Sequence, residues 1–311
     1  AALSWTFAHG ETTTFLRLAV ALRAYWLYHG GLSEGHMWLD NALTLIDAAP
    51  EPLRAAVLQT AAWIANAQGD DHKSELLAGQ SLALFRAQAD AAGEFDALYV
   101  LADAANVWGE VARARALAGD AIRLARTMGD PIRAAFATKL DGWFACLSGD
   151  TEAAERLIHE AVDLFQRAAC DYGVALALSE LGQIAFERGE HARAAELWRQ
   201  RLDLTWLPWE FRGAVKRLAE IAVACGEYER AVRLLGAAET LREQLGVELG
   251  PGYLAKHERD AATARAALGE SVFAAAWTEG RRLSLDEIWA EGTRVAHEPP
   301  AHPTTDTTAH G

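Results

Sequence analysis

The residues of this sequence that could recognise a ligand are aromatic, amide and charged side chains that recur one internal repeat apart. Asn66 and Asn106 lie 40 positions apart, and asparagine is a poor residue for the interior of a helix. An asparagine amide can both donate to and accept from a peptide backbone, and aromatic rings provide apolar surface beside it. The candidates for one binding groove are Gln59, Trp63, Asn66, Tyr99, Asp103, Asn106, Lys139, Trp143, Gln183 and Phe186. They predict a non-enzymatic site for a peptide or a small effector.

The aromatic candidates have a second interpretation, because aromatic residues at helical spacing more often belong to a core than to a binding site. In that case four of them pack between neighbouring repeats instead of contacting a ligand: Trp63, Tyr99, Trp143 and Phe186. Both interpretations place these side chains on the first helix of each repeat, so the sequence leaves the choice between them open.

Asp141 is a charged residue at a position where the other repeats carry apolar ones. The equivalent residues are Ala61, Leu101, Leu181 and Leu218. A carboxylate at a packing position is costly unless it is paired. We therefore expect Asp141 to pair with a neighbouring arginine, and we favour this over binding of a cationic group of a ligand.

These candidates must be positioned by a repeat that is marked by its glycines. The turn glycines are Gly30, Gly69, Gly109, Gly149, Gly189 and Gly226, at steps of 39, 40, 40, 40 and 37 residues. Most are followed directly by an acidic residue, and a small residue comes five positions after each one. Glycine tolerates the left-handed conformation that ends a helix, and the acidic residue favours the start of the next helix. A period of this length predicts a solenoid of helical hairpins.

The repeat divides the chain into an all-α solenoid of about six to seven hairpins with short flanking segments. We expect residues 1–11 to be a linker from a missing upstream domain, 12–245 to form six hairpins and 246–296 to form a hairpin with a capping helix. The expected helix pairs are 12–47, 51–88, 92–128, 131–169, 171–204 and 209–245. Proline and threonine are concentrated in residues 297–311, which predicts a disordered tail.

Composition excludes several functions. The net charge of −14 and the pI near 5.2 disfavour direct binding to nucleic acid, whose phosphates need a basic surface. Three cysteines without a short spacing and ten scattered histidines indicate neither disulfides nor a metal site, so no cofactor is expected. No apolar run is long enough to span a membrane, and no secretion signal opens the chain, so a cytoplasmic location is expected.

Both ends of the repeat array resemble a known family. The first part carries Leu3-Ser4-Trp5 and Tyr25-Trp26-Leu27-Tyr28-His29-Gly30, and the last carries Leu235-Gly236-Ala237-Ala238-Glu239 and Trp277-Thr278-Glu279-Gly280-Arg281. These segments resemble the C-terminal tetratricopeptide-repeat sensor region of LuxR-type regulators of the STAND ATPase class. The resemblance implies a right-handed superhelix with a concave binding face. It also implies a partner protein, peptide or small effector, and an ATPase domain upstream in the same polypeptide.

Parts of that family are missing from this sequence. No phosphate-binding loop of the Gly-x-x-x-x-Gly-Lys-Ser/Thr type occurs, and no helix-turn-helix follows residue 296. ATP hydrolysis and DNA binding are therefore not assigned to these residues, and a sensing role is expected to carry over. The alternatives are a static protein-protein scaffold and, less favoured, an α/α-toroid hydrolase or lyase, for which Asp96, Asp103 and Asp141 are the candidate acids.

Overall fold

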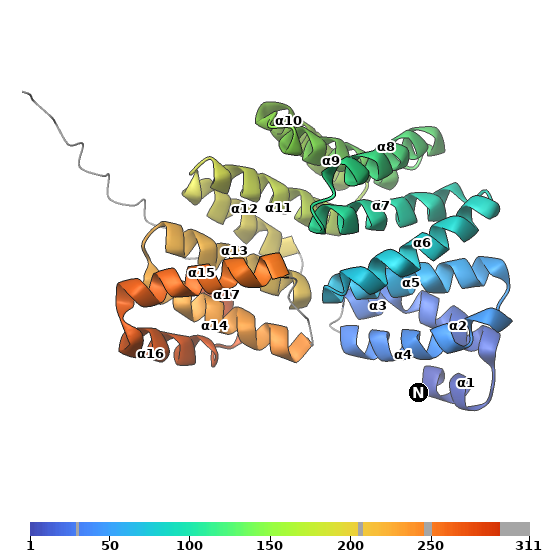
Figure 1. Cartoon of the computed structure of the whole chain (residues 1–311), viewed down its shortest axis with the longest axis horizontal. Coiled ribbons are helices and arrows are strands. Elements are labelled where there is room, and N and C mark those ends of the chain that lie inside the picture. Colours follow the sequence, from blue (N-terminus) through green and yellow to red (C-terminus); the bar gives the residue numbers. More distant parts are fainter. Residues whose placement is uncertain (29–30, 205–207, 246–250, 293–311) are drawn as a thin grey trace, which may run out of the picture.

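The structure is a computed structural model that describes residues 1–28, 31–204, 208–245 and 251–292. Throughout these residues the regular secondary structure is helical, with no strand (Figure 1). Consecutive helices pack as pairs, and the pairs stack along the chain. The predicted all-α solenoid of tetratricopeptide-like hairpins is therefore confirmed.

Five consecutive hairpins and a sixth at the C-terminus follow the expected pairing closely. The first helices of these pairs are α5 (Glu51–Gln68), α7 (Ala91–Val107), α9 (Pro131–Leu147), α11 (Asp171–Glu187), α13 (Pro208–Ala224) and α15 (Pro251–Leu268). The second helices are α6 (Asp71–Ala87), α8 (Val111–Met128), α10 (Thr151–Arg167), α12 (His191–Leu204), α14 (Tyr228–Leu245) and α16 (Glu270–Gly280). A last short helix, α17 (Leu285–Gly292), packs on α13 and α14.

The N-terminal part is more helical and more broken than expected. It contains α1 (Ala2–Ala8), α2 (Thr12–Ala21), α3 (Arg23–Tyr28), α4 (Leu32–Thr44) and the 3-10 turn η1 (Ile46–Ala48). Helix α1 lies within the segment 1–11 that we expected to be a linker, and it packs on α2. The first helix of the pair 12–47 is interrupted at Leu22. The turn glycine Gly30 and the tail 297–311 lie outside the described residues.

The turn glycines end their helices as the sequence predicts. Gly69 has a φ of 82°, and its N–H donates to the carbonyl of Asn66 at 3.0 Å. The next N–H, of Asp70, donates to the carbonyl of Ala65 at 2.9 Å, which is the hydrogen-bond pattern of a left-handed helix cap. The Asp70 side chain then caps α6 by accepting from the N–H of Lys73. One glycine-acid pair thus stops one helix and starts the next.

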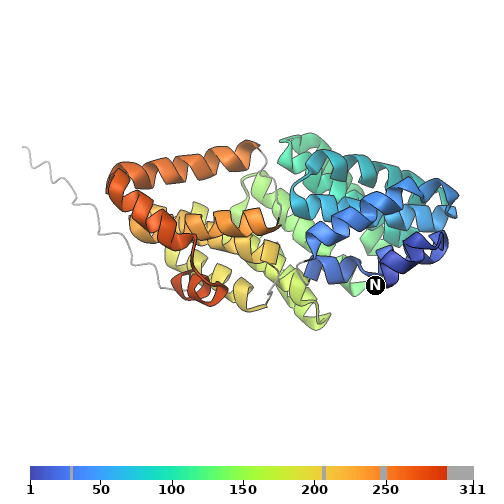
Figure 2. The ribbon, with the colours of Figure 1, turned by 90° about the horizontal axis from the view of Figure 1, so that it is seen from below.

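Small residues allow the paired helices to approach closely. The residues five positions past the glycines are buried, and Ser74, Ala114, Ala154, Ala194 and Ala231 are completely inaccessible. Most buried apolar residues form two large clusters, one N-terminal and one C-terminal, which meet at α9, and a small third cluster joins α14, α15 and α16. Figure 2 shows the N-terminal helices and the helices α13–α17 at opposite ends of the molecule, with the middle repeats between them.

The first helices of the pairs lie on the inner side of the curved stack. Direct packing joins α5 to α7, α9 to α11 and α13 to α15. Among the main helix contacts of the described residues, no such packing joins two second helices before α14. In a curved stack, elements on the inside are closer together than those on the outside. The odd-numbered helices therefore form an inner face, which we define by α5, α7, α9, α11, α13 and α15.

Candidate ligand-binding face

Side chains on the inner face bond from one repeat to the next. Asn66 Nδ2 on α5 donates to Asp103 Oδ2 on α7 at 3.0 Å. Lys256 Nζ on α15 donates to Glu220 Oε2 on α13 at 2.7 Å. Because each bond joins helices that are neighbours only through the stacking, these polar groups fix the distance between repeats as well as lining the face.

Gln59 lies inside the wall of this face. It is 3% exposed, its Nε2 donates to the carbonyl of Asp96 at 3.1 Å, and its Oε1 accepts from Ser81 Oγ at 2.7 Å. Both ends of the amide are thus used by the protein itself. This groove candidate therefore has a structural role and no open surface for a ligand.

Replacing Gln59 with leucine should therefore destabilise the fold without changing any binding at the inner face. Removing the buried amide loses two hydrogen bonds, from Gln59 to the carbonyl of Asp96 and from Ser81 to Gln59, which costs about 1–3 kcal/mol in the free energy of unfolding. Ser81 keeps its bond to the carbonyl of Ala78 at 2.9 Å. Urea denaturation measures the loss of stability. The folded variant should bind a ligand of the inner face with the same affinity as the parent chain. A loss of affinity with unchanged stability would contradict the structural role.

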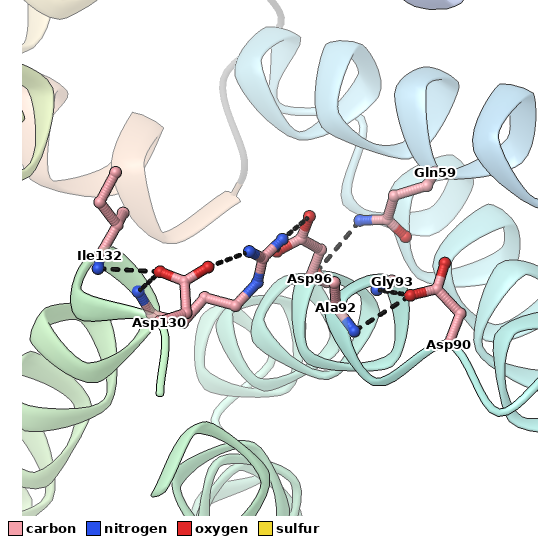
Figure 3. Close-up of polar contacts among 8 residues, drawn as sticks. Gln59, Asp90, Ala92, Gly93, Asp96, Asp130 and Ile132 are labelled. Carbon is pink, nitrogen blue, oxygen red and sulfur yellow. Dashed lines mark hydrogen bonds and ion pairs between the residues drawn. The ribbon is translucent and has the colours of Figure 1, made fainter. Parts of the chain in front are cut away.

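Asp96 on α7 and Asp130 at the start of α9 lie near Gln59 (Figure 3), and Arg133 joins their carboxylates. Its Nη1 donates to Asp130 Oδ2 at 2.6 Å, and its Nη2 lies 3.2 Å from both carboxylate oxygens of Asp96. Asp130 also caps α9 by accepting from the N–H groups of Ile132 and Arg133. Burial raises the pKa of Asp96, and the charges of Arg133 and Arg23 oppose that rise. The cluster is a structural tie between repeats.

Two of the aromatic candidates, Trp63 and Tyr99, contact rings of a neighbouring repeat, whereas Phe186 contacts a ring of its own hairpin. The rings of Trp63 on α5 and Tyr99 on α7 are stacked with centroids 6.0 Å apart. Tyr99 also meets Phe136 on α9 edge-on at 5.3 Å, and Phe186 approaches Trp198 at 6.3 Å. All of the aromatic candidates are half-buried. Trp63 and Tyr99 therefore combine packing between repeats with partial exposure of their rings.

Lys139 is the most buried charged candidate. It is 7% exposed and forms an ion pair with Glu180 on α11, and its Nζ lies 5.8 Å from the centre of the Tyr99 ring. Burial raises the pKa of Glu180, and the charge of Lys139 offsets part of this rise. The second oxygen of Glu180, Oε2, is buried without a hydrogen-bond donor. Lys139 is thus held by the protein, whereas Glu180 keeps an unused acceptor.

The remaining candidates lie at the accessible part of the face. Asp103 is exposed and Asn106 is half-buried. Gln183 is half-buried; its Nε2 donates to Glu187 Oε1 at 2.6 Å, and its own Oε1 is buried without a donor. Along with Trp143, these groups provide amide, carboxylate and aromatic contacts on three consecutive odd helices, α7, α9 and α11.

Asp141 pairs with an arginine, as we expected. Its Oδ2 lies 3.4 Å from Nη2 of Arg126 on α8. The side chain is 37% exposed, so its position in α9 is less buried than those of its apolar equivalents. Burial raises the pKa of Asp141, and Arg126 opposes the rise. The three carboxylates that an enzyme would need have separate partners, since Asp96 contacts Arg133, Asp103 contacts Asn66 and Asp141 contacts Arg126.

Sequence reasoning missed Glu180 and Glu187, and it had assigned no contact to Lys256. The sequence did contain a signal for Glu180, namely an acidic residue next to the apolar position Leu181. Such a residue is expected to pair with a cation of the neighbouring repeat. The partner, Lys139, is 41 positions earlier, so only the stacking geometry identifies it. Lys256 lies 5.7 Å from the ring of Phe186 and connects α15 with the inner face of α11.

Neither a metal site nor a membrane helix is found in the described part of the chain. No group of three or more His, Cys, Asp or Glu residues in residues 1–28, 31–204, 208–245 and 251–292 could hold a metal ion. In the same residues, no helix is both long enough and apolar enough to cross a bilayer.

Comparison with solved structures identifies the fold. The Rap protein complexed with competence and sporulation factor superposes with a TM-score of 0.60 at 16% identity, over 89% of this chain and 76% of that one. The apo form of the quorum sensor NprR from B. thuringiensis gives a TM-score of 0.50 at 14% identity, over 89% of this chain and 87% of that one. The chain therefore has the tetratricopeptide-like helical repeat fold of these proteins.

Sequence relatives of this tetratricopeptide-type chain are also regulators by name. No family model matches the chain. Over 153 residues, or 48% of its length, the chain is 31% identical to proteins of Mycobacterium tuberculosis and Mycobacterium bovis that are named as HTH-type transcriptional regulators. The match spans 17% of the length of those relatives. The resemblance to tetratricopeptide-repeat regulators is thereby confirmed.

Proposed function

We propose that this chain is the non-enzymatic effector-binding module of a transcriptional regulator and that the effector lies on the inner face. The observation that carries the proposal is that α7, α9 and α11 each present an exposed or half-buried polar or aromatic group at equivalent positions, namely Asp103, Trp143 and Gln183. The proposal is supported by the match to HTH-type regulators. It is also supported by the fold shared with Rap, a protein solved in complex with competence and sporulation factor.

An elongated ligand such as a peptide fits the spacing of this face best. Packed helices lie about 8–10 Å apart, and an extended chain advances about 3.3 Å per residue. Each repeat therefore corresponds to roughly three peptide residues. Three consecutive odd helices could hold a segment of roughly six to nine residues, each contacting a different repeat.

The wider context belongs to the same proposal. We place the module in the cytoplasm, downstream of an ATPase domain in the same polypeptide, as the sequence resemblance implies. Binding across several repeats would change the curvature of the stack and so bias the attached domain. This requires that the ligand has different affinities for two curvatures, because equal affinity shifts no equilibrium.

Replacing Trp143 with alanine tests the proposal directly. We expect the variant to bind the effector about tenfold more weakly or worse, because an aromatic anchor at the centre of an interface often contributes more than about 1.4 kcal/mol. Ligands are first found by the increase in melting temperature of the unmodified chain in libraries of peptides and metabolites, and affinities are then measured by calorimetry.

The matched control is Trp108→Ala, since Trp108 is 41% exposed at the turn between α7 and α8 and lies outside the proposed site. Equal affinities of the two variants would refute binding on the inner face. Small-angle scattering with and without the ligand separates a sensor from a static scaffold, because the scaffold predicts binding without a change in shape.

A further inference from the structure

A groove that the proposed function does not use opens between the consecutive helices α10, α11 and α12. Its cavity has a volume of about 550 Å³. Its floor is apolar and consists of buried side chains, among them Leu178 and Leu181 of α11 and Leu197 of α12. A step of two residues turns an α-helix by about 200°. Gln183, which belongs to the inner face, therefore points away from the side of α11 that carries Leu181.

The mouth of the groove combines accessible apolar surface with carboxylates. Val162 of α10 is half-buried, and Leu204 at the end of α12 is 37% exposed. Two exposed acidic residues, Asp171 and Asp203, line the same cavity. Apolar surface inside a polar rim is typical of sites at which another molecule docks.

The next repeat shows what fits on such a surface, because helix α17 of this chain covers the equivalent one. Helix α17 packs on α13 and α14, which take the places of α11 and α12 one hairpin later. Leu218 of α13 is the equivalent of the groove residue Leu181. A methyl group added at Gly292 of α17 would lie 2.9 Å from Cδ1 of Leu218. Ile288 of α17 is buried in the hydrophobic cluster that contains Leu218. A short helix with one apolar side therefore fits this kind of surface.

The contacts of α17 also show which charge such a helix should carry. Glu291 of α17 accepts from Nε of Arg233 on α14 at 3.0 Å. The equivalent of Arg233 on α12 is Glu196, so the charge at this position is reversed beside the open groove. Arg199 bonds both Glu196 and Asp203. Together with Asp171, three carboxylates then share one guanidinium group. A helix as acidic as α17 would meet like charges there, whereas a basic helix would meet opposite ones.

We propose that the groove between α10, α11 and α12 docks a short amphipathic helix of a partner protein, with its apolar side on Val162 and Leu181 and basic residues beside Asp171 and Asp203. Apolar side chains three and four positions apart on the helix would enter the cavity, as in other helix-in-groove complexes. Helix α17 of a second copy has a suitable shape, but its acidic residues disfavour it. The site is separate from the inner face and does not depend on the proposed function.

The probes are two labelled peptides whose shape is taken from α17 and which carry the same hydrocarbon staple. One has the sequence of residues 283–292, and the other carries Asp286→Lys, Glu287→Lys and Glu291→Lys. Circular dichroism checks that both are helical, and fluorescence anisotropy measures their affinity for the whole chain. At an ionic strength of about 0.01 M, where charges interact over about 30 Å, the basic peptide should bind at least about tenfold more tightly than the acidic one. Added salt should reduce this preference.

Two variants of the chain locate the peptide. Val162→Lys places a cation at the mouth of the groove and should weaken binding of the basic peptide about tenfold or more. Asp171→Asn with Asp203→Asn should reduce the preference for the basic peptide without weakening the acidic one. The matched control is Glu51→Gln with Asp120→Asn, which removes another acid from the first turn of an odd-numbered helix and another acid paired with an arginine. It should change neither affinity.

Melting curves check that each variant is folded, and the exposed pair Asp171 and Asp203 decides the matter if Val162→Lys does not fold. Equal or tighter binding of the acidic peptide would overturn the proposal, and in the second case would assign the groove to α17 of a second copy. Absence of binding by both peptides, or binding that neither variant changes, would also overturn it. Trp143→Ala should leave the affinity for the basic peptide unchanged. A loss in that variant would place the peptide on the inner face and would contradict docking in the groove.

Discussion

Replacing Lys139 with methionine is expected to lower the free energy of unfolding by about 3 kcal/mol, because it leaves the carboxylate of Glu180 buried without its counter-charge. The ion pair joins α9 to α11, where the two large hydrophobic clusters meet. Urea denaturation followed by circular dichroism measures the loss. The double variant Lys139→Met with Glu180→Leu should recover most of it, since two apolar side chains leave no charge without a partner.

The same variant should depend on pH in a defined direction. In the parent chain burial raises the pKa of Glu180 and Lys139 offsets part of the rise, so removing Lys139 raises it further. The folded variant then holds a proton at pH values where the unfolded chain, with a glutamate pKa near 4.3, has released it. Stability of the variant relative to the parent should therefore increase as the pH falls from neutral toward the pKa of glutamate in the unfolded chain.

Lys73→Met is the control for the single variant. Lys73 pairs with Asp40 at 2.6 Å, but this pair is much more exposed, with 26% and 48% of the two side chains accessible. Its removal should cost no more than about 1 kcal/mol. Equal losses for Lys139→Met and Lys73→Met, or a deficit of Lys139→Met that grows on acidification, would show that Glu180 does not lie in a desolvated environment.

The architecture could be read from the sequence because its signals are local. A glycine that ends one helix and an acid that caps the next act within a few residues, and their regular spacing indicates stacking. The break at Leu22 and the helix α1 were missed, since no glycine or proline marks the first and the second is only seven residues long. The resemblance to regulators came from segments at both ends and was confirmed by the comparisons.

The candidate face was harder to predict because the direction of a side chain depends on how the repeats are curved. Gln59 and Lys139 were expected to line a groove, yet both are buried between neighbouring odd helices. Their neighbours Asp103 and Gln183, from equally polar positions, reach accessible or half-buried surface. A rotation of one helix by a fraction of a turn separates these outcomes, and the sequence repeat does not specify it. Pairings such as Lys139 with Glu180 need the distance between stacked helices.

A second large effect is expected at the contact between α14 and α16, where two glycines bring the helix backbones together. A methyl group added at Gly280 would lie 2.1 Å from the carbonyl oxygen of Arg233, and one at Gly236 would lie 2.7 Å from that of Trp277. The segments around these two glycines are also among those that carry the family resemblance. The resemblance in these segments therefore reflects the glycines that close packing of the C-terminal hairpin requires.

Gly280→Ala is therefore expected to destabilise the C-terminal hairpin by about 3 kcal/mol, since the obstructing atoms are backbone and cannot move aside. Gly79→Ala is the matched control: it also lies within a helix, but nothing is found within 4 Å of the added methyl group. That variant should be stabilised by up to about 1 kcal/mol, because alanine is the better helix former.

Hydrogen exchange should be faster at the amides of α16 in Gly280→Ala, and also faster at those of α15, the helix that carries Lys256. If Gly280→Ala and Gly79→Ala had equal stabilities, the backbone contact between α14 and α16 would be absent in solution. Loss of the hairpin alone should leave Asp103, Trp143 and Gln183 in place, so the variant also tells whether the inner face binds its ligand without α15.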